Sequence, residues 1–280
     1  MGRGGRASSG APAIKLPPVA PLTVALLGLG EAGSALAGEL VAAGVFVRGF
    51  DPAAGNDVPG VHRAADAGAA VDGSDVVLSV TAASAALAAA GGAAGGLREG
   101  QVYADLNSSG AALKRAVAEV IAPTGAQFAD VALMGVVPLD GLRTPALASG
   151  PGAQAFAEHL GPLGMPVEVL GEEPGAAATR KLLRSVFMKG LAASCLESLR
   201  AARAAGCEDW MRAQIEGVLA GADAALLERL VSGSARHATR RIAEVADARD
   251  LLRELGVEPR VTVAAGGWLA QLESEKDGAT

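Results

Sequence analysis

The stretch that decides the fold is Thr23 to Asp51, TVALLGLGEAGSALAGELVAAGVFVRGFD. Its opening TVALL is a short apolar run, which predicts a buried parallel strand. A GxGxxG sequence begins at Gly28, and Ser34–Ala43 then places apolar residues at helical spacing. A glycine ends this helix, and Val45–Phe50 predicts a second strand. The stretch therefore predicts a strand–turn–helix–strand unit.

The glycines have the spacing of a dinucleotide-binding turn. Gly28 permits the tight turn, Gly30 lacks the Cβ that would keep a pyrophosphate away, and Gly33 lets the helix pack closely on the sheet. The helix N-terminus then directs N–H groups and a positive dipole end at the phosphates. Asp51, about 20 residues further on, can accept hydrogen bonds from ribose hydroxyls. This order predicts cofactor contacts at Gly28, Leu29, Gly30, Glu31, Ala32, Gly33 and Asp51.

Composition and charge bound the class of protein. A chain of 280 residues can bury one large core or two moderate ones. A net charge of −6 offers no basic surface to nucleic acid or to an anionic membrane. The two cysteines, Cys195 and Cys207, form no metal or disulfide framework, which favours reduced thiols in a cytoplasmic protein. The sequence shows no metal-ligand cluster, Ser-His-Asp order or P-loop.

Two stretches of the chain could be mistaken for a signal peptide or a membrane span. Residues 1–21 are rich in Gly, Ser, Pro and Ala but lack an apolar core, which excludes a secretory signal and predicts a disordered tail. The uncharged run 76–97 consists mostly of Ala, Gly and Ser, which are weak drivers of membrane insertion. A buried strand followed by an alanine-rich helix explains this run, so no membrane association is predicted.

Strands and helices alternate after the first unit. Ser109 is expected to cap the helix that follows it. Such alternation predicts an α/β fold, a Rossmann-type doubly wound sheet whose ligands bind at the carboxyl ends of the strands. That edge would gather Gly28, Thr81, Asn107 and Met134 around one crevice. The expected strands are 75–80, 101–106, 126–131, 147–149 and 167–170, and the expected helices are 62–70, 82–94, 111–121 and 152–160.

The sequence predicts that the second half of the chain is all-helical. Gly175–Ala205 is one long helix without proline, and further helices are expected at Glu208–Leu230, Ala235–Leu255 and around Val263–Glu273. The alanines and leucines of so small a domain give apolar faces without a core of their own, which predicts a homodimer. The expected parts are a tail at 1–21, a dinucleotide-binding domain at 22–171 and a helical domain at 172–280.

These features together resemble the β-hydroxyacid dehydrogenase and 6-phosphogluconate dehydrogenase superfamily. The resemblance is closest to its short members with a small helical C-terminal domain, and it extends from about Leu22 to the C-terminal helices. It implies a nicotinamide cofactor and an oxidoreductase that acts on a small-molecule substrate. The segments that carry it are 28–33, 75–81, 105–109, 130–135 and 175–185.

In that superfamily a lysine on the long interdomain helix is the general acid/base, and Lys181 matches it. Desolvation and a neighbouring cation, here Arg180 or Arg184, can lower the pKa of such a lysine toward neutrality. The alternative is a solvated helix lysine. Ser185 stands where the family commonly has an asparagine that holds the substrate hydroxyl, and a serine can still donate and accept.

Other positions depart from the family pattern. Arg184 stands where 6-phosphogluconate dehydrogenases have a histidine, and the loop Leu133–Val137 lacks the serine and paired glycines that often bind the substrate carboxylate. These changes argue against 6-phosphogluconate itself and suggest a less polar or differently anchored substrate. A histidine and two arginines at i, i+3 and i+4 on one helix either bind a substrate anion or form an exposed face. The substrate candidates are Ser108, Met134, Gly135, Arg184, His237, Arg240 and Arg241.

The sequence thus predicts an NAD(P)-dependent oxidoreductase that transfers a hydride between nicotinamide and a small 3-hydroxy acid or related carbonyl substrate. Lys181 would move the proton and Ser185 would position the hydroxyl. Asp51 favours NAD, because a carboxylate repels a 2′-phosphate, whereas Arg48 and Arg63 are each placed to reach one. Two alternatives remain, an imine reductase on this scaffold and a dinucleotide-binding protein without redox activity. Further cofactor contacts are expected at Val80, Thr81 and Asn107.

Overall fold

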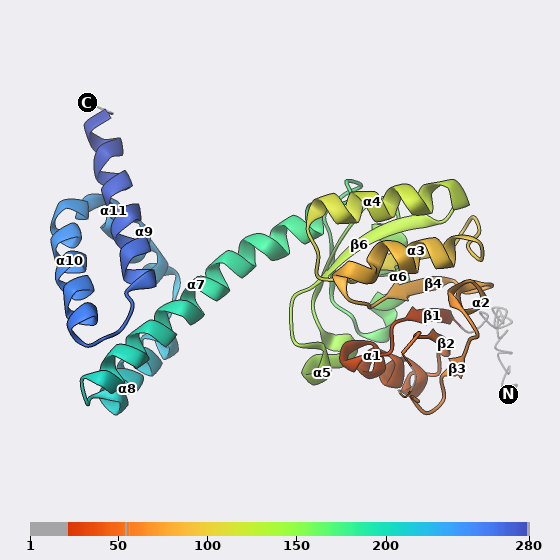
Figure 1. Cartoon of the computed structure of the whole chain (residues 1–280). Helices are drawn as coiled ribbons and strands as arrows, with labels where there is room; N and C mark the ends of the chain where they lie inside the picture. The colour runs from red at the N-terminus through yellow and green to blue at the C-terminus, as the bar shows by residue number, and fades with distance from the viewer. Residues whose placement is uncertain (1–21, 54, 56, 279–280) are drawn as a thin grey trace, which may run out of the picture. The chain divides into compact units, whose positions relative to one another are not determined.

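The structure is a computed structural model that describes residues 22–53, 55 and 57–278, with side chains to residue 276. The tail expected at 1–21 lies outside the described residues. The chain divides into two compact units within a long helix, α7 (Ala176–Ala204), so that the first unit ends at Leu182 and the second begins at Leu183 (Figure 1). Each unit is described by itself.

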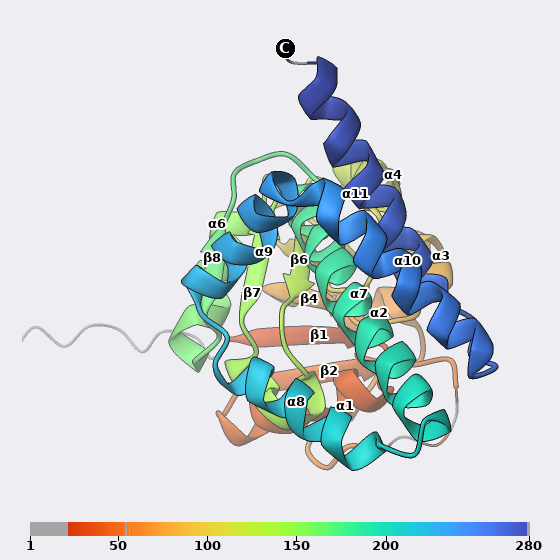
Figure 2. The same ribbon diagram turned by 90° about the vertical axis from the view of Figure 1, so that its left-hand side faces the viewer.

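The first unit contains an eight-stranded sheet of order β3-β2-β1-β4-β5-β6-β7-β8. The strands from β3 to β6 are all parallel to their neighbours, as Figure 2 shows for β1 and β2. Strand β7 runs antiparallel to β6, and β8 is parallel to β7. The Rossmann-type sheet predicted from the sequence is therefore confirmed. The strands are β1 (Thr23–Leu27), β2 (Phe46–Phe50), β3 (His62–Arg63), β4 (Val76–Ser79), β5 (Val102–Asp105), β6 (Gln127–Leu133), β7 (Ala146–Ser149) and β8 (Val167–Val169).

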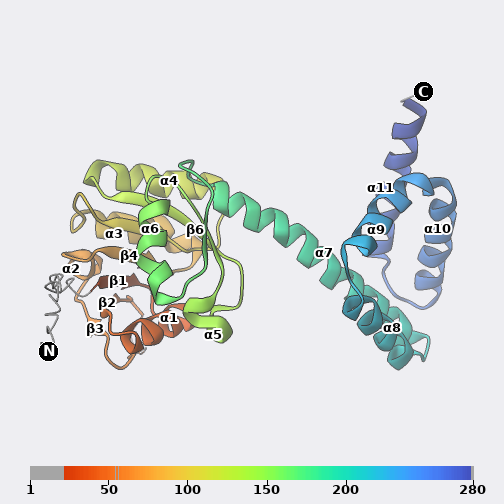
Figure 3. The same ribbon diagram turned by 180° about the vertical axis from the view of Figure 1, so that it is seen from behind.

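Helices cover both faces of this sheet. Alternate residues of the strands belong to two separate apolar cores, one on each face of the sheet. The core that includes Tyr103 and Phe128 packs against α2, α3 and α4, and the core that includes Leu26 and Leu78 packs against α1 and α6. Figure 3 shows these helices on the two faces. Buried strands of this kind place their carboxyl ends along one edge, where the site lies. The helices are α1 (Glu31–Ala42), α2 (Ala67–Val71), α3 (Ala86–Ala94), α4 (Ala111–Ile121), α5 (Val137–Asp140) and α6 (Ala153–Leu160).

Two local expectations in the first unit are wrong. Instead of a helix at 62–70, the chain forms the edge strand β3, and helix α2 begins only after Asp66, whose Oδ1 accepts from the Ala69 amide at 2.8 Å. Asp66 is a better cap than any residue before it, so the helix starts there. Ser109 does not cap α4, because Gly110 occupies the N-cap position and no side chain caps this helix.

The second unit is all-helical, as predicted. Helices α10 (Ala238–Glu254) and α11 (Arg260–Gly278) pack along each other, and α9 (Ala224–Arg236) contacts both. The single helix expected at 208–230 is wrong, because the chain forms two helices there. Helix α8 (Glu208–Ala220) ends before Gly221, and Asp223 caps α9 by accepting from the Leu226 amide at 2.7 Å. Among the described residues, no helix is both long and apolar enough to cross a membrane.

Candidate functional site

The glycine turn after β1 has three different constraints at its three glycines. Gly28 has φ of +98°, and a Cβ there would lie 2.2 Å from the carbonyl oxygen of Val80. A Cβ on Gly33 would lie 2.1 Å from the carbonyl oxygen of Gly28, so α1 is pressed against the turn. Gly30 is exposed, and no atom lies within 4 Å of the position its Cβ would take. The turn is therefore closed toward the protein and open at Gly30, where phosphates can approach the backbone.

Asp51 is fixed to this turn by its carboxylate. Its Oδ2 accepts from the Leu29 amide at 2.7 Å, and its Oδ1 accepts from the Ala53 amide at 2.8 Å. Each carboxylate oxygen has a second lone pair, so the group can still accept from a ribose hydroxyl. Arg63 donates from Nη2 to the Asp51 carbonyl at 3.3 Å, and Arg48 donates to the carbonyl of Asp72.

Two hollows open at the carboxyl ends of the strands and share Thr81. The first has a volume of about 340 Å³ and mostly apolar walls that include Gly28 and Phe50. The second has a volume of about 450 Å³ and is lined by Val80, Asn107 and Lys181, among others. Two adjoining hollows beside a glycine turn suit a ligand with two ring systems joined by phosphates.

Asn107 joins the ends of β4 and β5. Its Oδ1 accepts from the Thr81 amide at 2.5 Å, its Nδ2 donates to the Ser79 hydroxyl at 3.3 Å, and its backbone amide donates to Asp105 Oδ1 at 2.9 Å. The side chain is buried, so it fixes the shape of the second hollow from below. Asn107, where a cofactor contact is expected, thus lies in the wall of the second hollow, and its side-chain amide is hydrogen-bonded to Thr81 and Ser79.

Lys181 lies in the wall of the second hollow, in the second turn of α7. Its Nζ donates to the Ser108 hydroxyl at 2.9 Å, and the lysine is half-buried while Ser108 is exposed. Two residues that the sequence singled out separately are therefore brought into contact. A lysine amine beside a hydroxyl in a hollow next to the glycine turn can exchange a proton with a ligand there.

The loop after β6 forms the other wall of this hollow. Gly135, one of the substrate candidates, lines it together with the apolar side chains of Leu133, Val136 and Val137. Met134 instead donates its backbone amide to the Pro145 carbonyl at 2.7 Å, across β6 and β7, and is not part of the lining. Among the described residues that line the hollow, Lys181 is the only cation.

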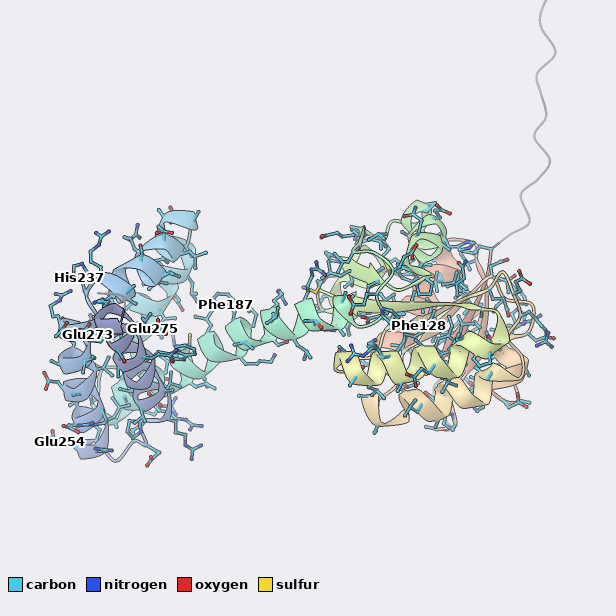
Figure 4. The ribbon with its side chains drawn as sticks, turned by 90° about the horizontal axis from the view of Figure 1, so that it is seen from above. Phe128, Phe187, His237, Glu254, Glu273 and Glu275 are labelled. Atoms are coloured by element: carbon cyan, nitrogen blue, oxygen red, sulfur yellow. The ribbon has the colours of Figure 1, made fainter. Side chains whose placement is uncertain are left out.

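The remaining substrate candidates lie in the second unit. Arg184 and Ser185 follow Lys181 along α7, and Ser185 is one helical turn beyond it. His237 stands at the junction of α9 and α10 (Figure 4). Arg240 pairs with Glu244 at 3.5 Å, and Arg241 donates to the Ser234 hydroxyl at 2.6 Å. These two arginines thus have acceptors within the helical unit itself.

The sequence did not reveal a buried ion cluster beneath the site. Lys114 of α4 is 1% exposed, and its Nζ lies 3.4 Å from Asp105 Oδ1 and 3.3 Å from Asp130 Oδ1. Burial raises the pKa of the Asp105 carboxyl, and the ammonium of Lys114 opposes that rise. A lysine in an amphipathic helix is normally exposed, so only the pairing of β5 with β6 could have pointed to this cluster.

Both units are similar to domains of known proteins. Residues 23–156 match the NAD binding domain of 6-phosphogluconate dehydrogenase, and residues 202–272 match a domain of unknown function, DUF1932. A conserved hypothetical protein from Sinorhizobium meliloti is 31% identical, covers 89% of this chain and 87% of its own, and has a TM-score of 0.59.

Two further solved structures are similar. A conserved protein of unknown function, described as structurally similar to 3-hydroxyacid dehydrogenases, is 28% identical, with coverage of 91% of this chain and 98% of its own and a TM-score of 0.59. An imine reductase from Aspergillus terreus in complex with NADPH4 is 21% identical, with coverage of 93% and 96% and a TM-score of 0.75.

The fold and the glycine turn define a dinucleotide-binding protein of the dehydrogenase and reductase class. More narrowly, the chain combines an NAD binding domain of the 6-phosphogluconate dehydrogenase type with a DUF1932 domain. The resemblance inferred from the sequence motifs is thereby confirmed.

Proposed function

We propose that this protein is an NAD-dependent oxidoreductase that interconverts a small 3-hydroxy acid, or a related alcohol, and the corresponding carbonyl compound. The observation that carries the proposal is the 2.9 Å contact between Lys181 Nζ and Ser108 Oγ in a hollow beside the glycine turn. An amine and a hydroxyl in that place can hold and move the proton that an alcohol loses on oxidation.

The residues that would hold the dinucleotide belong to the first unit. The opening at Gly30 admits phosphates to the N-terminus of α1, where no side chain caps the first turn within the described residues. Asp51 would accept from the ribose hydroxyls, which favours NAD over NADP. Arg63, beside the Asp51 carbonyl, is the residue that would hold a 2′-phosphate if NADP were bound instead. When bound, the nicotinamide supplies or accepts the hydride.

Lys181 would act as the general acid/base. In its ammonium form it donates to Ser108, and that hydroxyl keeps the amine directed into the hollow. A proton on Nζ can pass to a carbonyl oxygen during reduction and return from the hydroxyl during oxidation. Gly135 would line the substrate space in the hollow. Ser185, one turn further along α7, would position the substrate hydroxyl.

Imine reduction is the second candidate, and the apolar wall of the hollow favours it. Leu133, Val136 and Val137 offer no group that pairs with a carboxylate, and Lys181 is the only cation in the described lining. A substrate without a carboxylate would fit such a wall better than a hydroxy acid. The imine reductase from Aspergillus terreus shares the fold.

We also propose that the active protein is a homodimer. The second unit leaves large apolar side chains in solvent, among them Phe187, Trp210 and Trp268. Apolar patches of this kind in a small domain are typical of subunit interfaces. A second copy of the same chain would bury them.

The test is a turnover panel followed by two lysine variants. Oxidation of NADH and NADPH is measured with keto acids, aldehydes and cyclic imines, and reduction of NAD and NADP with 3-hydroxy acids. With the substrate so found, Lys181→Met should lower kcat by about 10²–10⁴-fold with little change in the cofactor Kd. Lys189→Met, about two turns further along α7, is the matched control. A protein that binds the dinucleotide tightly but turns over no member of the panel would instead be a dinucleotide-binding protein without redox activity.

A further inference from the structure

A row of buried polar side chains crosses the sheet beneath the site. Ser79 pairs in register with Asp105, Asp105 with Asp130, and Asp130 with Ser149, on four neighbouring strands. All four side chains are fully buried. Residues paired in register point to the same face of a sheet, so they form one continuous row. Buried polar groups are costly to desolvate, so such a row calls for a specific explanation.

At one end, the row fixes the first turn of α7. Asp130 Oδ2 accepts from the backbone amides of Gly175 at 3.1 Å and Ala178 at 3.0 Å, and from the Ser149 hydroxyl at 3.2 Å. The Ser149 Oγ in turn accepts from the Ala177 amide at 3.0 Å. The amides at the start of α7 are therefore held by two side chains of the sheet.

The approach of α7 is close at this point. Gly175 has φ of +100°, and a Cβ there would lie 2.8 Å from the Cβ of Ala111 in α4. Lys181 follows Ala177 and Ala178 by about one helical turn. Its height above the sheet is therefore set by the same hydrogen bonds that anchor the helix.

At its centre, the row also fixes the loop that carries Ser108. Lys114 Nζ donates to the Asp105 carbonyl at 2.6 Å and lies within 3.4 Å of carboxylate oxygens of both Asp105 and Asp130. Asp105 Oδ1 accepts from the Asn107 amide, immediately before Ser108. The buried Lys114 ammonium thus lies between Asp105, which holds the loop of Ser108, and Asp130, which holds the start of the helix that carries Lys181.

We infer that Asp130, Ser149, Lys114 and Asp105 are positioning residues that hold Lys181 Nζ against the Ser108 hydroxyl. The inference rests on the proposed function for its catalytic consequence, but not for the geometry. Displacing a catalytic group by about 1 Å can cost on the order of 10²-fold in rate. Loss of the Asp130 carboxylate should therefore slow the reaction through Lys181 while leaving dinucleotide affinity nearly unchanged.

The first experiment measures the order of Lys181 without any substrate. The chain has five lysines (24 Lys and Arg in all), and ¹³C-labelled lysine gives each ε-methylene its own NMR signal, with Lys181 assigned from Lys181→Met. In the parent the two ε protons of Lys181 should be inequivalent, because Nζ is held on Ser108. In Asp130→Asn they should merge into one averaged signal, while Lys189 stays unchanged. A folded Asp130→Asn protein with the parental Lys181 signal would overturn the inference.

Two further variants keep the test decisive if Asp130→Asn does not fold. Ser149→Ala removes the acceptor of the Ala177 amide and should shift the Lys181 signal in the same direction by less. Ser74→Ala is its matched control, a buried serine at the opposite end of the strands that donates to the Val71 carbonyl. A Lys181 signal that responds equally to both serine variants would contradict the inference.

The second experiment separates positioning from catalysis. Asp130→Asn should lower kcat by about 10- to 100-fold in the parent, yet have almost no further effect in a Lys181→Met background. Equal effects in both backgrounds would mean that Asp130 acts through general stability and not through Lys181. Full activity of Lys181→Met would instead remove the proposed function, and the NMR result would still decide whether Asp130 positions the lysine.

Discussion

The two units of this chain bury their side chains to very different extents. The first unit has two extensive apolar cores and encloses even charged groups, including Lys114, Asp105 and Asp130. Among the described residues of the second unit, only four hydrophobic side chains are buried: Ala202, Ala238, Leu252 and Leu269.

The two units therefore differ in how they are stabilised, the first by its own core and the second, as we propose, by burial of its apolar faces against another subunit. The first unit has a large enough core to hold a polar network and the glycine turn at defined positions, which a proton-transfer site requires. The second unit leaves Trp210 at 61% and Trp268 at 67% exposure, so its apolar faces are available to another subunit. Cofactor binding and proton transfer by Lys181 should therefore depend on the first unit, and assembly on the second.

The largest effect is expected where α1 packs against the glycine turn of the first unit. Gly33→Ala would place a Cβ 2.1 Å from the Gly28 carbonyl oxygen and should destabilise the protein by about 3 kcal/mol. Dinucleotide affinity should fall with it, because the turn must open to admit the methyl group. Urea unfolding and NADH titration measure both. Gly38→Ala in the same helix meets no atom within 4 Å and should stabilise slightly, by up to about 1 kcal/mol. Equal effects of the two variants would show that the turn is not tightly packed.

The contrast in burial predicts a dimer. Sedimentation equilibrium at micromolar concentration should give about twice the 27.6 kDa chain mass. Both tryptophans of the chain lie in the second unit, so their fluorescence should shift to longer wavelength on dilution as the dimer separates. A single-chain mass across the concentration range would show that the second unit is stable in solvent without a partner.

A smaller effect is expected for cofactor choice. Asp51→Asn removes the negative charge that repels a 2′-phosphate but keeps an acceptor for the Leu29 amide. The preference for NADH over NADPH should fall by about tenfold, consistent with one charge-assisted hydrogen bond. Parallel titrations of both nucleotides measure it. Tighter binding of NADPH by the parent protein would refute the NAD assignment.

The smallest effect is expected in the second unit, at Glu197. Burial raises the pKa of this carboxyl, but hydrogen bonds from the Thr262 hydroxyl and from the Val261 and Thr262 amides outweigh it, so the pKa is lowered. The stabilisation of α11 by Glu197 is therefore present above the ordinary carboxyl pKa and is lost as the pH falls through the lowered value. Glu197→Gln should cost about 1 kcal/mol near neutral pH, as removal of a helix cap does, and less in acid. Hydrogen exchange at Val261 and Thr262 measures this, and a cost independent of pH would contradict it.

Local sequence chemistry was enough to predict the dinucleotide turn. Gly33 packs on Gly28, and Asp51 accepts from the Leu29 amide, all within the first strand–helix–strand unit, so the spacing of these residues carries most of the information. The contact of Gly28 with Val80 depends in addition on the pairing of β1 with β4. Local signals were likewise enough for the long helix and for the parallel order of the first six strands. The break at Gly221 also had a local signal, the following Asp223, which a continuous apolar pattern outweighed.

The buried polar side chains that we infer to position Lys181 could not be predicted in this way. Asp105 and Asp130 become neighbours only because β5 pairs with β6 in that register, and Lys114 reaches them from α4. Lys114 reads as a surface residue in an amphipathic helix, and only the fold shows that its ammonium is enclosed. Interactions between residues far apart in the sequence leave no periodic pattern in it.

Chemical rescue of Lys181→Ala tests proton transfer by the first unit most directly. With the substrate from the turnover panel, kcat should fall by about 10²–10⁴-fold while the Kd for NADH stays at the parental value. Added methylamine should restore part of kcat, because a free amine can occupy the space beside Ser108 that the side chain leaves. Lys189→Ala should keep the parental kcat and show no response to methylamine. A Lys181→Ala enzyme with parental kcat would contradict the assignment of Lys181 as the general acid/base.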